Sequence, residues 1–225
     1  MSLRKLNLVE GEFYHIYNRG NSKQEIFLDS EDYDRFTKLL YLSNSTTRVN
    51  FKEDIVKKKI DVWDFKRGNQ IVTIGAWVLM PNHFHLYLTP AQGESLGEPV
   101  VSIFMKKLCT AYTMYFNKKY NRTGTLFEGP FKSVHVSSEN QAKYLFSYIH
   151  LNPVKLIQKD WKEKGIKNKN EVFKFLDSYK WGSYFDYMGI NRKESKIINR
   201  LNFLDYFPTN LDFKKEIFDW IKAKE

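Results

Sequence analysis

Two apolar segments on either side of Pro81-Asn82 most constrain the fold of this chain. Ile71 to Leu79 is a strongly apolar run, which predicts a central strand of a sheet. Pro81 and Asn82 break that run, and His83 to Thr89 again has the composition of a strand. Strands joined by so short a turn pair with each other as a hairpin. We therefore predict an antiparallel hairpin within a larger sheet.

Strand and helix patterns alternate irregularly around this hairpin. Aromatic and β-branched residues predict strands over Phe13–Asn18 and over Leu126–Val136, the second interrupted at Gly129-Pro130. Helix signals follow Asp29, Pro99 and Ser138, and Pro153 stops the last of these helices, predicted over Glu139–Leu151. This order predicts an α+β fold, in which helices pack on an antiparallel sheet.

The segments outside this pattern carry more charge and weaker signals. Residues 46–69 form a charged insertion, with a small helix predicted around Asp54–Ile60. Ala91 to Glu98 is typical of a loop. The tail from residue 154 is rich in lysine, and Phe213–Lys224 has the spacing of an amphipathic helix.

Composition restricts the partner and the compartment. A net charge of +10 favours a polyanionic partner such as nucleic acid, although a solvated lysine-rich surface has the same composition. The single cysteine, Cys109, excludes an intramolecular disulfide and predicts a reducing environment. There is neither a signal-peptide pattern nor an uncharged stretch near the ~20 residues that span a membrane, so we expect a cytoplasmic protein.

His83-Phe84-His85 is the sharpest local feature. In a strand, residues two apart point to the same face, so both imidazoles can hold one divalent cation while Phe84 points away. The same pattern also fits a half-buried histidine pair without a metal.

Tyr144, Tyr148 and Asn152 are spaced by four residues and would share one face of a helix. A tyrosine can attack a phosphodiester and form a covalent phosphotyrosine. The carbonyl oxygen of Asn152 could complete a metal site, although Pro153 disfavours a helical conformation at Asn152 and predicts a frayed end there. Core packing is the competing role for each of these tyrosines, since the chain contains 14 of them.

Several cations and histidines are candidates for DNA contact, because cations bind phosphates and aromatic rings stack on bases. Two further histidines have weaker claims: His135 could lie near the functional face, and His150 is expected to be structural or on the surface. The candidate DNA contacts are His15, Arg19, Lys118, Lys119, Arg122 and Lys132.

Together these motifs resemble the REP-associated tyrosine transposases, a branch of the single-tyrosine HUH transposases. Ala76–His85 is similar to that family's strand and its His-hydrophobic-His motif, and Tyr148–Val154 to its nucleophile helix. The resemblance extends from about residue 13 to about residue 190. Supporting matches are Tyr14-His15, Asn18-Arg19-Gly20, Tyr115-Phe116-Asn117 through Gly124, Phe127-Glu128-Gly129, and Trp181-Gly182-Ser183-Tyr184 with Tyr187.

The resemblance implies a ferredoxin-like (RRM-like) antiparallel sheet and a transposase domain over residues 1–190, followed by an extension at 191–225. It implies that His83, His85 and Asn152 hold Mg²⁺ or Mn²⁺ and that Tyr148 is the nucleophile. The implied substrate is single-stranded DNA with hairpin, REP-like palindromic elements. It is cut and rejoined through a 5′-phosphotyrosine by a monomer or a homodimer.

Three other functions remain compatible with the sequence. A non-catalytic DNA-binding protein could keep the same fold. An RNA-binding module could use its aromatic residues for base stacking. A zinc hydrolase would need a firm third ligand, and the chain has no HExxH motif to supply one.

Overall fold

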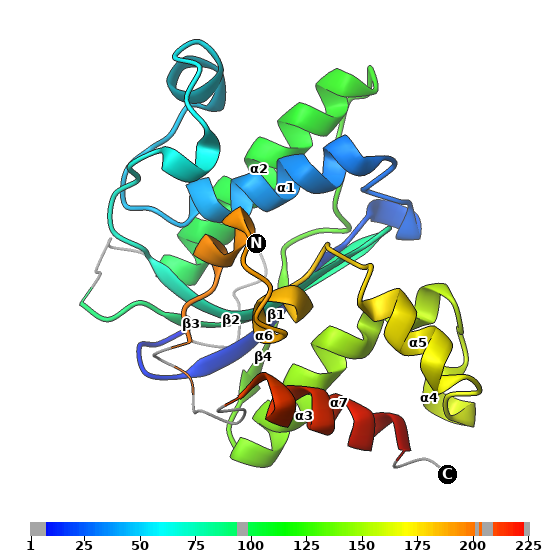
Figure 1. Cartoon of the computed structure of the whole chain (residues 1–225). Coiled ribbons are helices and arrows are strands. Elements are labelled where there is room, and N and C mark those ends of the chain that lie inside the picture. Colours follow the sequence, from blue (N-terminus) through cyan, green and yellow to red (C-terminus); the bar gives the residue numbers. More distant parts are fainter. Residues whose placement is uncertain (1–7, 94–98, 201–202, 204–208, 223–225) are drawn as a thin grey trace.

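The computed structural model describes residues 8–93, 99–200, 203 and 209–222. Four strands form one antiparallel sheet in the order β2-β3-β1-β4, as Figure 1 shows. The element order β1-α1-β2-β3-α2-β4 with this strand order is the ferredoxin-like arrangement, which confirms the predicted α+β class. The strands are β1 (Phe13–Arg19), β2 (Val72–Met80), β3 (His83–Pro90) and β4 (Lys132–Val136).

Helices cover both faces of this sheet (Figure 1). Helices α1 (Ser30–Ser43) and α2 (Val100–Lys119) lie on one face, and they enclose the first core together with Ile16, Phe84 and Leu86. Helix α3 (Glu139–Leu151) lies on the other face, where Ala76, Val78 and Tyr87 belong to the second core. Because alternate strand residues point to opposite faces, His83 and His85 share the α3 side with Tyr87.

The predicted hairpin and helix starts are confirmed. Met80 pairs with His83 across the turn, so Pro81 and Asn82 form the turn of the β2–β3 hairpin. The Asp29 carboxylate caps α1 by accepting the N–H groups of Glu31 and Asp32, and Ser138 caps α3 in the same way. The predicted Ala91–Glu98 loop and the end of the predicted Phe213–Lys224 helix lie partly outside the described residues.

Two local predictions were wrong. The strand predicted over Leu126–Val136 is confined to β4, because Gly129, with φ +153°, and Pro130 turn the chain before it. The helix predicted at Asp54–Ile60 is a single wide helical turn, η2 (Phe51–Val56), and Lys59, with φ +53°, lies just beyond it. A second short turn, η3 (Val62–Asp64), follows.

Most of the tail packs on the α3 side of the sheet or borders β2, whereas Ile197 packs into the first core on the α1 side. Gly182 and Ile198 each bridge to β2, and Phe213 and Ile217 are buried in the second core. No helix in the described ranges is long and apolar enough to cross a membrane. The tail elements are η4 (Asn152–Leu156), α4 (Trp161–Lys164), α5 (Lys169–Leu176), α6 (Tyr184–Tyr187), η5 (Lys193–Ile197) and α7 (Asn210–Lys222).

Candidate active site

The histidines of the His83-Phe84-His85 motif meet on the α3 face of the sheet. Their ring centroids are 4.9 Å apart, in an edge-on arrangement. The Asn82 side-chain carbonyl lies 2.6 Å from His83 Nδ1, so Nδ1–H donates to it and Nε2 is left as the basic nitrogen. Phe84 points into the first core, as the strand pattern predicts.

His15 joins this pair from the neighbouring strand. His15 Nε2 lies 2.8 Å from His85 Nδ1. Burial lowers the pKa of His15 to about 4 and that of His85 well below its usual value, so both rings are neutral at pH 7. His85 is only 6% exposed, and its Nε2 is buried without a hydrogen-bond partner among the described residues.

Helix α3 places Tyr148 against these histidines. The Tyr148 ring lies 5.4 Å from His85 and 6.3 Å from His15, centroid to centroid. Ile149 of the same helix is fully buried in the second core, which fixes the rotation of the helix and leaves Tyr148 half-buried beside the sheet. Burial raises the pKa of the Tyr148 phenol above its usual value.

Asn152 completes the group at the end of α3. Asn152 is fully buried, and neither its amide nitrogen nor its amide oxygen has a hydrogen-bond partner of normal geometry among the described residues. Burial lowers the pKa of His83 to about 4 and raises that of Tyr148, and the Asn152 amide lies near enough to both side chains to oppose each shift in part. The predicted fraying is not found, because Asn152 has helical angles (φ −55°, ψ −39°) and Pro153 lies in the first turn of η4, where its missing N–H is not needed.

Two lysines that the sequence analysis missed stand over the Tyr148 ring. Lys162 Nζ is 3.7 Å from the ring centroid and Lys155 Nζ is 5.8 Å away. Both are close enough to His85 to lower its pKa, as their positive charges oppose protonation. The lysine-rich tail concealed them, because no spacing pattern distinguishes these two from the other lysines.

The predicted DNA contacts divide between the two faces of the sheet. Lys132 pairs with Tyr17 on the α3 face and is exposed. Arg19, the last residue of β1, lies on the same face opposite His83 and forms an ion pair with Glu128 at the surface. Lys118 lies in the last turn of α2, which covers the other face of the sheet, and Arg122 follows the end of that helix.

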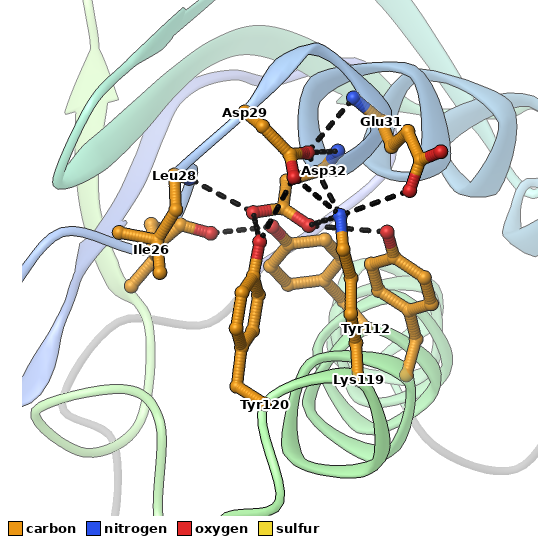
Figure 2. Close-up of polar contacts among 9 residues, drawn as sticks. Ile26, Leu28, Asp29, Glu31, Asp32, Tyr112, Lys119 and Tyr120 are labelled. Atoms are coloured by element: carbon orange, nitrogen blue, oxygen red, sulfur yellow. Dashed lines mark hydrogen bonds and ion pairs between the residues drawn. The ribbon is translucent and has the colours of Figure 1, made fainter.

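Lys119 is engaged at that same end of α2 (Figure 2). Its ammonium contacts Asp29, Glu31 and Asp32 within 3.1 Å, and these carboxylates raise its pKa. The network ties the end of α2 to the start of α1, and Tyr120 donates to the buried Asp32 carboxylate. The positive charge of Lys119 is therefore balanced by carboxylates of the protein and is not presented to a phosphate.

The two remaining histidines lie outside the site. His135 pairs with Tyr14 on the first-core face, with Nε2 2.5 Å from Glu12. His150 is buried, where Nδ1–H donates to the Phe146 carbonyl and Nε2 accepts from the Ser183 hydroxyl. His150 thus has the structural role that its position on α3 predicted.

The described part of the chain contains no cluster of three His, Cys, Asp or Glu side chains suited to a metal ion. A mixed donor set is present instead, because His85 Nε2 and the Asn152 carbonyl oxygen are buried and lack a hydrogen-bond partner of normal geometry among the described residues. Buried polar atoms without partners are costly, and a bound cation would satisfy them. Neutral imidazoles and an amide oxygen therefore fit a divalent ion at this point.

Comparisons with known proteins give several similar solved structures. No protein-family model matches the chain, and no curated protein matches it. A REP-associated tyrosine transposase bound to a REP hairpin is 13% identical over 86% of this chain and 90% of its own, with a TM-score of 0.49. A candidate transposase from Deinococcus radiodurans R1 is 15% identical over 64% of this chain and 93% of its own, with a TM-score of 0.34.

Proposed function

We propose that this protein is a metal-dependent tyrosine transposase that cuts and rejoins single-stranded DNA carrying hairpins. The observation that carries the proposal is the position of Tyr148, 5.4 Å from His85 in ring centroids, next to the unpaired donors of His85 and Asn152. The hairpin substrate is inferred from the sequence motifs, and the net charge of +10 is consistent with it.

Tyr148 attacks the scissile phosphorus through its phenolic oxygen in this proposal. The bond from phosphorus to the 3′ oxygen breaks, the phenolic proton is lost to solvent, and the departing oxygen takes a proton to become a 3′-hydroxyl. The 5′-phosphotyrosine that forms conserves the phosphodiester bond energy, so a 3′-hydroxyl can later displace Tyr148 and rejoin the strand without ATP.

Lys155 and Lys162 offset the negative charge of the approaching phosphate. Their ammonium groups stand 5.8 and 3.7 Å from the Tyr148 ring centroid, so a phosphate that reaches the phenol meets two cations. The proposed metal ligands are neutral side chains, so the positive charge that the protein itself supplies here comes from such lysines.

His83, His85 and Asn152 would hold the divalent ion, which when bound supplies Lewis-acid polarisation of the scissile phosphate. Nitrogen donors are unusual for Mg²⁺ and are better tolerated by Mn²⁺, so we expect tighter binding of Mn²⁺. The Asn82 carbonyl and His15 orient the two imidazoles through their other nitrogens.

The test is adduct formation on single-stranded hairpin DNA with randomised unpaired flanks, in Mn²⁺. The wild type should give a covalent protein–DNA band on a denaturing gel, and Tyr148→Phe should give none. Tyr144→Phe is the matched control, because that tyrosine lies one turn away on α3 and should leave the band intact. A band that persists in Tyr148→Phe would place the nucleophile elsewhere, and hairpin binding without any band would favour a non-catalytic DNA-binding protein.

A further inference from the structure

Tyr144 is an exposed aromatic residue on α3. Among the described residues it is the aromatic side chain that remains exposed, at 48%, although the chain contains 18 Phe, 14 Tyr and 5 Trp. It lies one helical turn before Tyr148 on α3. Its position beside the candidate nucleophile, rather than its exposure alone, makes this ring a candidate contact for a ligand that reaches Tyr148.

The ring of Tyr144 is held in place from two sides. It is parallel to the Tyr148 ring, with an angle of 5° and centroids 6.2 Å apart. Trp220 of α7 meets it edge-on at 5.2 Å, and the Trp220 indole N–H donates to Glu216 at 3.0 Å. A ring fixed in this way loses little conformational entropy when a flat ligand stacks on its solvent-exposed surface.

Cations lie next to this aromatic surface. Lys162 and Lys155 stand over Tyr148, the next ring along α3. An aromatic platform beside a line of cations is the combination with which proteins bind single-stranded nucleic acid, since bases stack on the ring and phosphates contact the ammonium groups.

We infer that Tyr144 stacks an unpaired DNA base that flanks the phosphate presented to Tyr148. This inference rests on the proposed function, because it takes the position of the phosphate from the role of Tyr148. Stacking accepts any of the four bases, so Tyr144 contributes affinity and the position of the strand rather than sequence recognition.

The test compares the binding of two fluorescein-labelled strands by anisotropy, a (dT)12 oligonucleotide and a strand of twelve abasic residues. Tyr144→Ala should weaken (dT)12 binding roughly 5- to 150-fold, the range for loss of one base stack. Tyr144→Phe should stay close to wild type, because it keeps the ring. Met114→Ala is the control, since Met114 is 69% exposed on α2, away from the site.

The abasic strand separates stacking from a structural effect. If Tyr144 stacks a base, wild type and Tyr144→Ala bind the abasic strand equally well. Equal weakening toward both strands would mean that the substitution disturbs α7 or α3, and unchanged binding of (dT)12 would mean that no base is stacked; either result overturns the inference. A failure of the proposed function, seen as an adduct formed by Tyr148→Phe, leaves these binding results unaffected.

Discussion

His15 Nε2 lies 2.8 Å from His85 Nδ1, across the β1–β3 pair. When two neutral imidazoles meet through one hydrogen bond, one nitrogen donates and the other accepts. If Nδ1 of His85 carries the proton, its Nε2 is free of hydrogen and can bind a cation. Metal-binding histidines are commonly oriented through their other nitrogen in this way. The sequence suggested a DNA contact for His15, but the position of its ring favours a role in orienting His85.

The first prediction is that His15→Ala weakens Mn²⁺ binding about 10- to 100-fold, the usual effect of removing a group that orients a metal ligand. Isothermal titration calorimetry on the DNA-free protein measures this directly. His135→Ala serves as the control, because His135 lies on the opposite face beside Glu12. Equal Mn²⁺ affinity in His15→Ala and wild type would exclude this role.

The second prediction concerns the Lys119 network (Figure 2). Lys119→Met should lower the free energy of unfolding by about 1–3 kcal/mol, because the fully buried Asp32 carboxylate loses its cation while its other hydrogen bonds remain. Urea denaturation measures the difference. Lys118→Met, a change at the exposed neighbour, should have little effect, and comparable losses in both variants would contradict a specific network.

The same network predicts the direction of a pH effect. The Lys119 ammonium, as the main cause, holds the pKa of Asp29 below its usual value of 3.8. A carboxyl group with a lowered folded-state pKa stabilises the protein fully above its unfolded-state pKa, and that stabilisation is lost as the pH falls through the folded-state pKa. The difference between wild type and Lys119→Met should therefore shrink in acid, below about pH 4.

The third prediction is that Cys109 is chemically inert in the folded protein. Burial raises the pKa of its thiol to about 12, so very little thiolate is present at pH 8. Alkylation by iodoacetamide should be roughly 100-fold or more slower than in the urea-unfolded chain. Rapid labelling without denaturant would show that the thiol is accessible.

The fourth prediction tests whether the segment beyond residue 190 belongs to the same folded unit. Phe213 is fully buried among Phe146, His150 and Tyr187, so Phe213→Ala should cost about 3–5 kcal/mol of stability. Leu211→Ala, at a residue that is 78% exposed, should cost little. If Phe213→Ala unfolds at the same urea concentration as wild type, α7 is a loosely attached extension.

Sequence periodicity predicted the sheet and its main helices because those elements are regular. The hairpin around Pro81-Asn82 and the capped helix α3 have local signals that their surroundings do not override. The strand predicted over Leu126–Val136 was too long. Leu126 and Phe127 are buried in the first core, but the backbone there is irregular, and irregular backbone has no periodicity to detect.

The sequence predicted the residues of the site that belong to local motifs, but not the contacts between those motifs. His83 and His85 share a face by strand geometry, whereas the contact of Tyr148 with His85 depends on how α3 crosses the sheet. Lys162 comes from a four-residue helix in a lysine-rich tail, and only tertiary packing brings it over Tyr148. Short helices held by distant contacts leave little trace in a sequence.

The most direct measurement of the central claim is the identity of the residue bonded to DNA. The adduct formed in Mn²⁺ would be digested with trypsin and nuclease, and the modified peptide sequenced by mass spectrometry. We predict a nucleotide linked through a 5′-phosphate to Tyr148, in the peptide that follows Lys143. A nucleotide attached to Tyr144, or to any residue other than Tyr148, would contradict this account.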